Sequence, residues 1–232
     1  MKFSIFAIAA AAAAAVATLV QGYQTGLDVS ALTSTSSFSC AKNLGYDHVI
    51  ARCYMEAYGN NPGGKVDPNC YSNYKNAKAA GFTSVDIYMF PCTGRSTCKS
   101  PATQVQEIVD YVGAHKMIVG TLWLDVEVDS AANNWPSTSE ARSTLRAFKT
   151  ALDKSGWKWG VYSSKSQWTR ITGSASWVLD PSVPLWYSHY DDTLSFSDYP
   201  SHAFGGWSKP TIKQYTGDAS FCSASWDKNY YG

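Results

Sequence analysis

The chain has 232 residues, a formal net charge of +1 and an aromatic content of 14%. It contains no run of basic residues, which argues against nucleic acid and against an anionic membrane surface as partners. Its nine Trp and fifteen Tyr suit a carbohydrate ligand, because apolar faces of sugar rings stack on aromatic side chains, although most aromatics in any fold serve as core.

The first 22 residues are predicted to be a signal peptide. Lys2 supplies a positive start, Ile5–Val20 is apolar and rich in alanine, and Val20 and Gly22 are small residues suited to cleavage before Tyr23. A transmembrane anchor is disfavoured, because the apolar run is shorter than a bilayer span and no basic cluster follows it. We therefore expect the mature chain, residues 23–232, to be secreted or delivered to a lumenal compartment.

Cysteine usage fits the same compartment. The mature part contains an even number of cysteines, namely Cys40, Cys53, Cys70, Cys92, Cys98 and Cys222. Such a set behind a signal peptide predicts disulfides, and Cys92 and Cys98 are placed to close a short loop. A zinc site is disfavoured, because the chain has neither a CxxC pair nor histidines at ligand spacing. We predict no metal and no cofactor.

Strand and helix patterns alternate along the first two thirds of the mature chain. Strands are predicted at Gly26–Ser30, His48–Met55, Ser84–Phe90, Leu122–Val128 and Lys158–Ser164. Helices are predicted at Ala41–Leu44, Asn69–Ala80, Pro101–His115, Ser139–Lys154 and Ser166–Ile171, and loops at Thr33–Ser39 and Gly59–Pro68. Beyond these, Leu185–Tyr190 and Thr211–Tyr215 have strand patterns without a long helix between them.

This order of elements predicts the fold class. Repeated strand–helix units form a parallel sheet with right-handed crossovers. Three further strand-like pieces without helices, including Leu185–Tyr190 and Thr211–Tyr215, would close that sheet into an irregular TIM-like α/β barrel. No linker or internal repeat interrupts the mature chain, so we expect a single domain.

The stretch Leu122–Val128 carries two acids in an apolar setting. Strand side chains alternate between faces, so Asp125 and Glu127 share one face, while Leu124, Val126 and Val128 share the buried one. Neighbouring carboxylates repel, which raises the pKa of one of them and equips it as a general acid. The alternative is a strand end with two solvated or salt-bridged acids, and the pattern alone favours neither interpretation.

Two other acids can meet this pair. In such a barrel the active site lies at the C-terminal ends of the strands, where Asp28 also falls. Asp227, near the end of the chain, can return to the same mouth. Clustered carboxylates, abundant aromatics and no metal-ligand spacing indicate hydrolysis of a glycosidic bond, which requires one protonated acid and one carboxylate.

At this point the mature chain resembles glycoside hydrolase family 25, the Chalaropsis-type lysozymes or N-acetylmuramidases, in a secreted eukaryotic branch. The resemblance rests on five motifs in the family's order: Gly26–Ser30, Asp125–Glu127, Gly160–Ser164, Leu185–Tyr187, and Gln214–Tyr215 followed by Asp227–Asn229. It implies a barrel of eight strands and five helices, (β/α)5(β)3. It also implies cleavage of the β-1,4 bond between N-acetylmuramic acid and N-acetylglucosamine in bacterial peptidoglycan. We further expect a role in defence against bacteria or in their digestion, and a monomer without stable membrane association.

The resemblance also implies residue roles. Glu127 resembles the family's general acid, and Asp125 its second carboxylate, which stabilises positive charge on the sugar or orients the acetamido group. Asp28 and Asp227 match the two remaining family acids. One departure is Lys213, because the family often has Trp before the Gln-Tyr pair, which puts one substrate contact in doubt.

Several side chains are candidates for substrate binding. They are aromatic residues near predicted strand ends together with the glutamine of the last motif, namely Tyr54, Tyr88, Trp123, Tyr162, Trp186, Tyr187, Tyr190 and Gln214. For each aromatic the competing interpretation is packing in the barrel.

Two other functions remain open. A chitinase-like barrel also carries an Asp-x-Glu strand end, but it usually has a further Asp where this chain has Trp123. A carbohydrate-binding protein without catalysis is the third possibility, and retention of all four acids argues against it.

Overall fold

The structure is a computed structural model that describes residues 24–57, 61–129 and 134–232. The predicted signal peptide, residues 1–22, lies outside the described residues. Within the described ranges, no helix combines the length and the hydropathy needed to cross a bilayer.

The described elements follow the predicted order. The strands are β1 (Gln24–Val29), β2 (His48–Met55), β3 (Lys65–Val66), β4 (Ser84–Met89), β5 (Leu122–Asp125), β6 (Trp159–Ser163), β7 (Leu185–Ser188), β8 (Ile212–Phe221) and β9 (Ala224–Tyr231). The helices are α1 (Thr35–Asn43), α2 (Cys70–Ala79), α3 (Pro101–Ala114), α4 (Thr138–Ser155), α5 (Lys165–Thr172) and α6 (Tyr199–His202).

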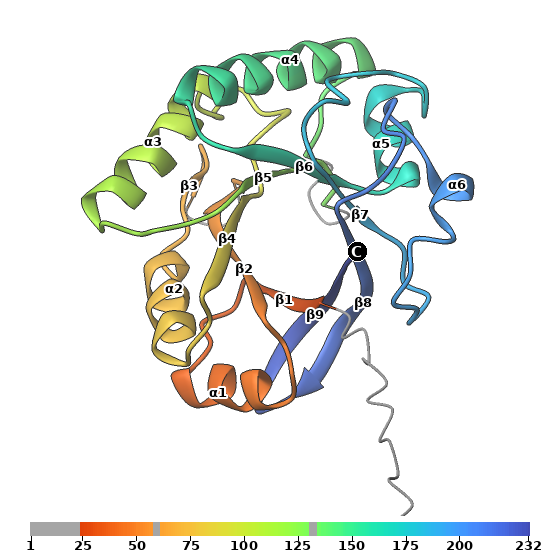
Figure 1. Ribbon diagram of the computed structural model, residues 1–232. Helices are drawn as coiled ribbons and strands as arrows, with labels where there is room; N and C mark the ends of the chain where they lie inside the picture. Colours follow the sequence, from red (N-terminus) through yellow and green to blue (C-terminus); the bar gives the residue numbers. More distant parts are fainter. Residues whose placement is uncertain (1–23, 58–60, 130–133) are drawn as a thin grey trace, which may run out of the picture.

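Eight of these strands form a closed barrel, which confirms the predicted fold class. Parallel pairing runs from β1 through β2, β4, β5, β6, β7 and β8, and antiparallel β9 joins β8 to β1 and closes the ring. The two-residue β3 is added to the edge of β2. Helices α1 to α5 lie around the outside of the barrel, which Figure 1 shows nearly end-on.

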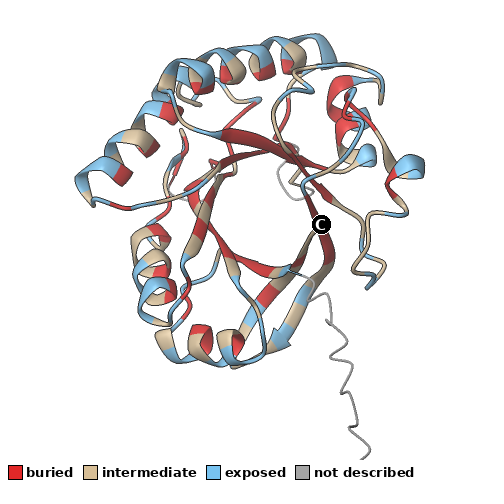
Figure 2. Cartoon of the chain, viewed as in Figure 1, coloured by how far each residue is buried: buried red, intermediate tan, exposed pale blue. Residues whose placement is uncertain are grey.

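The core has one part inside the barrel and another outside it. The inner cluster consists of Ile50, Trp123, Tyr162, Trp186 and Ile212. A larger cluster, which includes Leu124 and Val126, fills the space between the strands and the helices. Buried residues accordingly follow the strands and the inward faces of the helices in Figure 2. Leu124 and Val126 thus lie on the face opposite Asp125, as the alternation predicted.

The helix α1 starts earlier than predicted. The segment Thr33–Ser39 was expected to be a loop, but the helix begins at Thr35, where the hydroxyl of Ser34 accepts a hydrogen bond from the backbone N–H of Ser37 (3.1 Å). Serine at the N-cap position satisfies a backbone donor that would otherwise lack a partner. Phe38 and Ala41 form the buried face, so the loop prediction was wrong because the polar residues hid a short helix.

The C-terminal part also contains elements whose positions the sequence did not give, among them the third of the strands expected to close the barrel. Strand β9 pairs with β8 across a turn at Cys222 and Ser223, both of which have positive φ angles (53° and 58°). Two such residues give a tight turn that matches the twist of a hairpin. The short α6, with four residues, was not predicted either and raises the helices in the described residues from five to six.

All six cysteines form disulfides, as the sequence predicted. Cys92 pairs with Cys98 and closes the short loop between them. Cys53 pairs with Cys70 and joins β2 to α2. Cys40 pairs with Cys222 and joins α1 to the hairpin of β8 and β9, across a sequence separation of 182 residues.

Candidate active site

The four predicted acids meet at one cavity at the C-terminal end of the barrel. Asp28 lies near the end of β1, Asp125 ends β5, and Glu127 follows it by two residues. Asp227 lies on antiparallel β9, directly opposite Asp28. All four line a cavity of about 80 Å³ together with Tyr88, Tyr162, Trp186, Tyr190 and Gln214.

The strand that carries the central pair ends earlier than predicted. Regular β5 stops at Asp125, yet the backbone N–H of Val126 still donates to the carbonyl of Tyr162 (2.9 Å). Two further contacts hold the segment: the indole N–H of Trp135 donates to the Glu127 carbonyl (2.7 Å), and the Val128 N–H donates to Gln167 (3.0 Å). Glu127 is therefore held on the cavity side although it lies outside the strand.

Asp28 is held by two side-chain amides. The Oδ2 atom of Asp28 accepts hydrogen bonds from Gln214 Nε2 (2.9 Å) and Asn229 Nδ2 (2.7 Å). Gln214 Oε1 in turn accepts from the hydroxyls of Tyr162 (2.6 Å) and Tyr190 (2.8 Å). Because both tyrosine hydroxyls donate to Oε1, the Gln214 amide is oriented with its Nε2 atom toward Asp28.

Asn229 was not singled out from the sequence as a site residue. Its Oδ1 atom accepts a hydrogen bond from the indole N–H of Trp186 (2.8 Å), so it links an aromatic wall of the cavity to Asp28. A signal was present, because Asn229 lies two residues after Asp227 and the side chains of such residues share one face of a strand.

The pKa values of the acids in the cavity are higher than those of the same acids in water. Burial, followed by repulsion from Glu127 and Asp28, raises the pKa of Asp125 well above its usual range. Burial and repulsion from Asp227 raise the pKa of Glu127 to about 7. The contact between the two carboxyl groups raises the pKa of Asp125 and lowers that of Glu127, so Asp125 keeps its proton to a higher pH than Glu127 does.

The other acid pair behaves similarly. Burial and repulsion from Asp227 raise the pKa of Asp28 well above its usual range, against the opposing effect of the Asn229 and Gln214 hydrogen bonds. Burial also raises the pKa of Asp227, although its Oδ1 accepts the backbone N–H of Asp218 (2.7 Å). The pKa values of all four carboxyl groups are thus raised, and Glu127 exchanges its proton near neutral pH.

One oxygen of Asp125 is available to a ligand. Its Oδ1 atom is buried and hydrogen-bonds with no atom of the described residues. The hydroxyls of Tyr88 and Tyr162 lie nearby and remain protonated, because burial raises the pKa of both well above 10. A buried polar oxygen without a partner is costly, so this atom is placed to bond a group that enters the cavity.

Three of the predicted substrate-binding residues do not line the cavity. Tyr54 and Tyr187 are fully buried in the outer core, where their hydroxyls donate to Glu107 (2.9 Å) and Asp198 (2.8 Å). A bulge between Arg52 and Tyr54 breaks the alternation of β2, so Tyr54 packs outside the barrel.

Trp123, the third, does share the inner face with Asp125 but lies deeper. Its indole N–H donates to Asp86 (2.9 Å), and its ring crosses Gly160 so closely that a Cβ atom there would lie 2.5 Å from it. Tyr88, Tyr162, Trp186, Tyr190 and Gln214 are the predicted binding residues that the structure brings to the acids.

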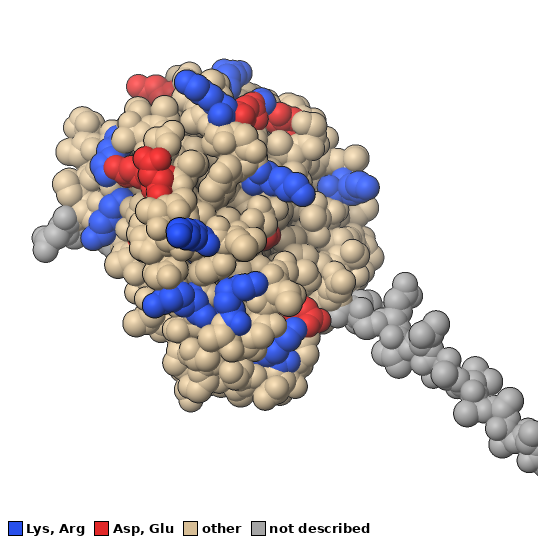
Figure 3. Space-filling model, turned by 60° about the vertical axis from the view of Figure 1, so that its left-hand side comes forward, with Lys and Arg blue, Asp and Glu red and all other residues tan. Residues whose placement is uncertain are grey.

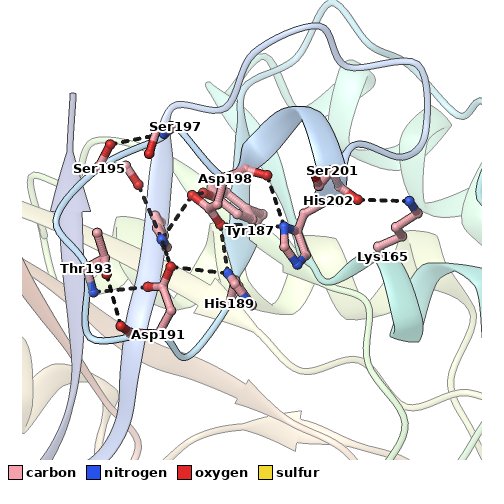
Figure 4. A network of polar contacts seen from close by, with 11 residues as sticks. Lys165, Tyr187, His189, Asp191, Thr193, Ser195, Ser197, Asp198, Ser201 and His202 are labelled. Atoms are coloured by element: carbon pink, nitrogen blue, oxygen red, sulfur yellow. Dashed lines mark hydrogen bonds and ion pairs between the residues drawn. The ribbon is translucent and has the colours of Figure 1, made fainter.

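Lys213, the departure from the family pattern, points away from the cavity. It is fully buried, and its ammonium group pairs with Asp191 (2.8 Å) and Asp198 (3.0 Å). These contacts fix the segment after β7 that carries Tyr190. Figure 4 shows this network, in which Asp198 also accepts from His189 (2.7 Å).

The same network contains a candidate metal-ligand set. His189, Asp198 and His202 each offer an atom, and these atoms lie within 4.8 Å of one another. No metal was predicted from the sequence, and the set lies outside the acid cavity.

On the face shown in Figure 3, Lys and Arg are interspersed with Asp and Glu, so no single charged patch covers that face.

Comparison with known proteins gives a consistent result. The family model for lysozyme-like protein 1 matches residues 20–215. The chain is 38% identical over 207 residues to a probable GH family 25 lysozyme 2 of Dictyostelium discoideum, with 89% of this chain and 90% of that protein covered. It is also 38% identical over 214 residues to lysozyme-like protein 5 of Caenorhabditis elegans, with 91% and 93% covered.

Among solved structures, a bacterial lysozyme from Streptomyces coelicolor shares the fold, with a TM-score of 0.66 and 20% identity over 91% of this chain and 93% of that one. The acids Asp28, Asp125, Glu127 and Asp227 lie inside or just beyond the matched region. By sequence and by fold, the chain belongs to the glycoside hydrolase family 25 lysozymes.

Proposed function

We propose that this glycoside hydrolase is a muramidase that cleaves the β-1,4 bond between N-acetylmuramic acid and N-acetylglucosamine in bacterial peptidoglycan. The observation that carries the proposal is the single cavity lined by Asp28, Asp125, Glu127 and Asp227. Hydrolysis of a glycosidic bond needs an acid that is protonated and a carboxylate that is charged, both within reach of one bond.

Glu127 is the proposed proton donor. With a pKa of about 7 it carries a proton at mildly acidic pH, and it can pass that proton to the glycosidic oxygen as the bond breaks. Repulsion from Asp227 supports this role, because it keeps the proton on Glu127 at a pH where an ordinary glutamate is charged.

Asp125 is the proposed partner of the sugar. Its free Oδ1 atom can bond the acetamido group of the substrate. Once Glu127 has given its proton to the glycosidic oxygen, it can accept the proton of Asp125, which leaves Asp125 as a carboxylate that stabilises positive charge on the ring. Asp28 and Asp227 act through the cavity: Asp28 anchors Gln214 and Asn229, and Asp227 adjusts the pKa of Glu127.

The cavity also suggests how the glycan lies. A volume of about 80 Å³ holds only a few water molecules, since water occupies about 30 Å³ in the liquid. The sugar rings then lie across the mouth, and the groups at the scissile bond enter the cavity. The aromatic side chains of the lining that can contact them are Tyr88, Tyr162, Trp186 and Tyr190.

The substitution Glu127→Gln tests the proposal. It keeps the shape of the side chain and removes the proton donor, so clearing of a bacterial cell-wall suspension should slow by at least about 100-fold. The matched control is Glu140→Gln, at the start of α4, which should clear at the parental rate. A Glu127→Gln protein as active as its parent would refute the assignment.

The same assay separates the other functions. Reducing sugar released from chitin, with none from peptidoglycan, would favour a chitinase-like activity. Binding to either polymer without hydrolysis by the parent protein would favour a carbohydrate-binding role.

We further propose that the protein acts outside the cell or in a digestive lumen, as a monomer, against bacteria. Three disulfides suit an oxidising compartment. The test is expression of the full chain with a C-terminal tag. Tagged protein in the medium or in a lumenal fraction, with an N-terminus near Tyr23, supports the proposal, and full-length protein in the cytosol overturns it.

A further inference from the structure

A second hollow lies at the same end of the barrel as the acid cavity. It has a volume of about 580 Å³, and its lining comes from the start and outer side of α5, the end of β7 and the region of α6. We call it the α5–β7 groove. Ser164, which follows β6, and Ser188, which ends β7, both line it, so it opens where the parallel strands end.

The groove adjoins the acid cavity through two contacts. Ser188, which lines the groove, is the register partner of Gln214, which lines the cavity, on the neighbouring strand β8. On α5, Gln167 accepts the backbone N–H of Val128, the residue directly after Glu127. A ligand with its reacting bond at Glu127 therefore has the groove within reach of its side groups.

The two hollows have opposite charge character. The cavity contains four carboxyl groups, whereas the groove lining contains Lys165, Arg170, His189 and His202 and no acidic residue. Lys165 and Arg170 are exposed on α5. The ammonium group of Lys165 bonds the Ser201 carbonyl (3.0 Å), which holds that side chain across the groove toward α6.

The two acids that contact His189 of the lining, Asp191 and Asp198, do not cancel this charge. Asp198 is paired with His189 (2.7 Å) and with buried Lys213, and Asp191 is also paired with Lys213. Counted without the histidines, Lys165, Arg170 and Lys213 exceed these two aspartates by one charge. The groove thus offers exposed donors for an anion beside a cavity that repels anions.

We propose that the α5–β7 groove binds the carboxylates of the stem peptide that peptidoglycan carries on the lactyl group of N-acetylmuramic acid. This inference rests on the proposed function. A glycan with carboxylate-bearing side groups cannot place them among Asp125, Glu127 and Asp227, so they require a separate site close to the scissile bond. The groove has the position and the charge for that task, with Lys165 and Arg170 as specificity-determining residues.

The test is equilibrium binding to a Glu127→Gln protein, which holds the substrate without cleaving it. Three soluble ligands are compared by calorimetry: glycan strands with stem peptides, strands from which an amidase has removed the peptides and left the free lactyl carboxylate, and strands whose stem carboxylates have been amidated. We expect the stem-bearing strands to bind about five- to tenfold more tightly than the other two, as expected for two exposed charge contacts.

Adding Lys165→Gln and Arg170→Gln to the Glu127→Gln protein should abolish the preference for stem-bearing strands. The affinity for the strands without peptides should stay unchanged. The matched control adds Lys154→Gln and Lys158→Gln, which remove two charges at the opposite end of the barrel, near the end of α4 and before β6. The control should retain the preference.

Equal affinity for the three ligands, or a preference that survives loss of Lys165 and Arg170, would overturn the inference. Hydrolysis of the stripped strands by the parent protein tests the muramidase proposal separately. If the parent protein cleaves all three ligands equally well, the proposal for the groove is refuted and the muramidase proposal stands. Thermal unfolding checks that each variant is folded.

Discussion

Replacing Asp227 by asparagine should lower the pH at which the enzyme loses activity. Asp227 is the largest source of repulsion at Glu127, whose pKa of about 7 depends on it. Like charges that share a site raise each other's pKa by about one to three, and Asp227 is only partly buried, so we take an effect of about one. The substitution therefore lowers the pKa of Glu127 to about 6, which corresponds to about 1.4 kcal/mol.

The sign follows from the role of Glu127. A proton donor must be protonated, so kcat/KM falls as pH rises through its pKa. At pH 7 the protonated fraction drops from about one half to about one tenth, a loss of about fivefold, while at pH 5 both proteins remain more than nine-tenths protonated. We therefore expect a pH-dependent defect, with the alkaline limb of the kcat/KM profile about one pH unit lower.

The assay is hydrolysis of soluble peptidoglycan strands from pH 4 to pH 9. Asp218→Asn is the matched control: it removes a charge next to Asp227 but keeps the backbone N–H that Asp227 accepts. Its alkaline limb should stay near pH 7. If Asp227→Asn lowers the rate by the same factor at every pH, its charge does not set the pKa of Glu127, and the reasoning fails.

Three further predictions concern stability and the remaining aromatic candidates. Tyr54→Phe removes the hydrogen bond to Glu107 (2.9 Å) and should cost about 1 kcal/mol in urea unfolding, with KM unchanged because the ring lies outside the cavity; a clear rise in KM would restore Tyr54 as a substrate contact. Replacing Cys40 and Cys222 by alanine opens a loop of 182 residues and should lower the free energy of unfolding by about 5 kcal/mol; a loss below about 1 kcal/mol would show that the bond does not constrain the unfolded chain. Fully buried Glu56 has its pKa raised to about 7 by burial and the neighbouring Asp129 carboxyl. The folded state therefore holds the Glu56 proton more tightly than the unfolded state does. The resulting contribution to the free energy of unfolding, up to about 3 kcal/mol, is complete below about pH 4 and is lost as pH rises toward 7. Glu56→Gln should remove this pH dependence, and equal pH dependence of stability in parent and variant between about pH 4 and pH 8 would contradict the prediction.

Much of the candidate site could be predicted from local patterns. Asp125 and Glu127 stand out because acids are rare within an apolar strand, and two-residue alternation places them on the face opposite Leu124 and Val126. The succession of strands and helices was enough to place Asp28 at the same mouth. These inferences succeeded because they depend on residues close together in the sequence.

Other features could not be predicted in this way. The bulge at Arg52 and Tyr54 reverses the face of a single tyrosine, and nothing in the neighbouring sequence marks it. The third closing strand, β9, was expected but not located, because Cys222 and Ser223 take the positive φ angles of its turn without the usual Asn-Gly signal. The sequence prediction placed the start of helix α1 too late, because its first turn is built from serine and threonine.

The sequence by itself determined the barrel class, the disulfide-forming cysteines and the acids at the strand ends, because periodicity and residue type are local properties. The tertiary structure alone decided which aromatics line the cavity and what holds each acid. Asp28 accepts its hydrogen bond from Asn229, 201 residues further along the chain. The charged groove beside the cavity likewise exists only where α5 and β7 come together. Such contacts depend on barrel closure and strand register, which no short stretch of sequence encodes.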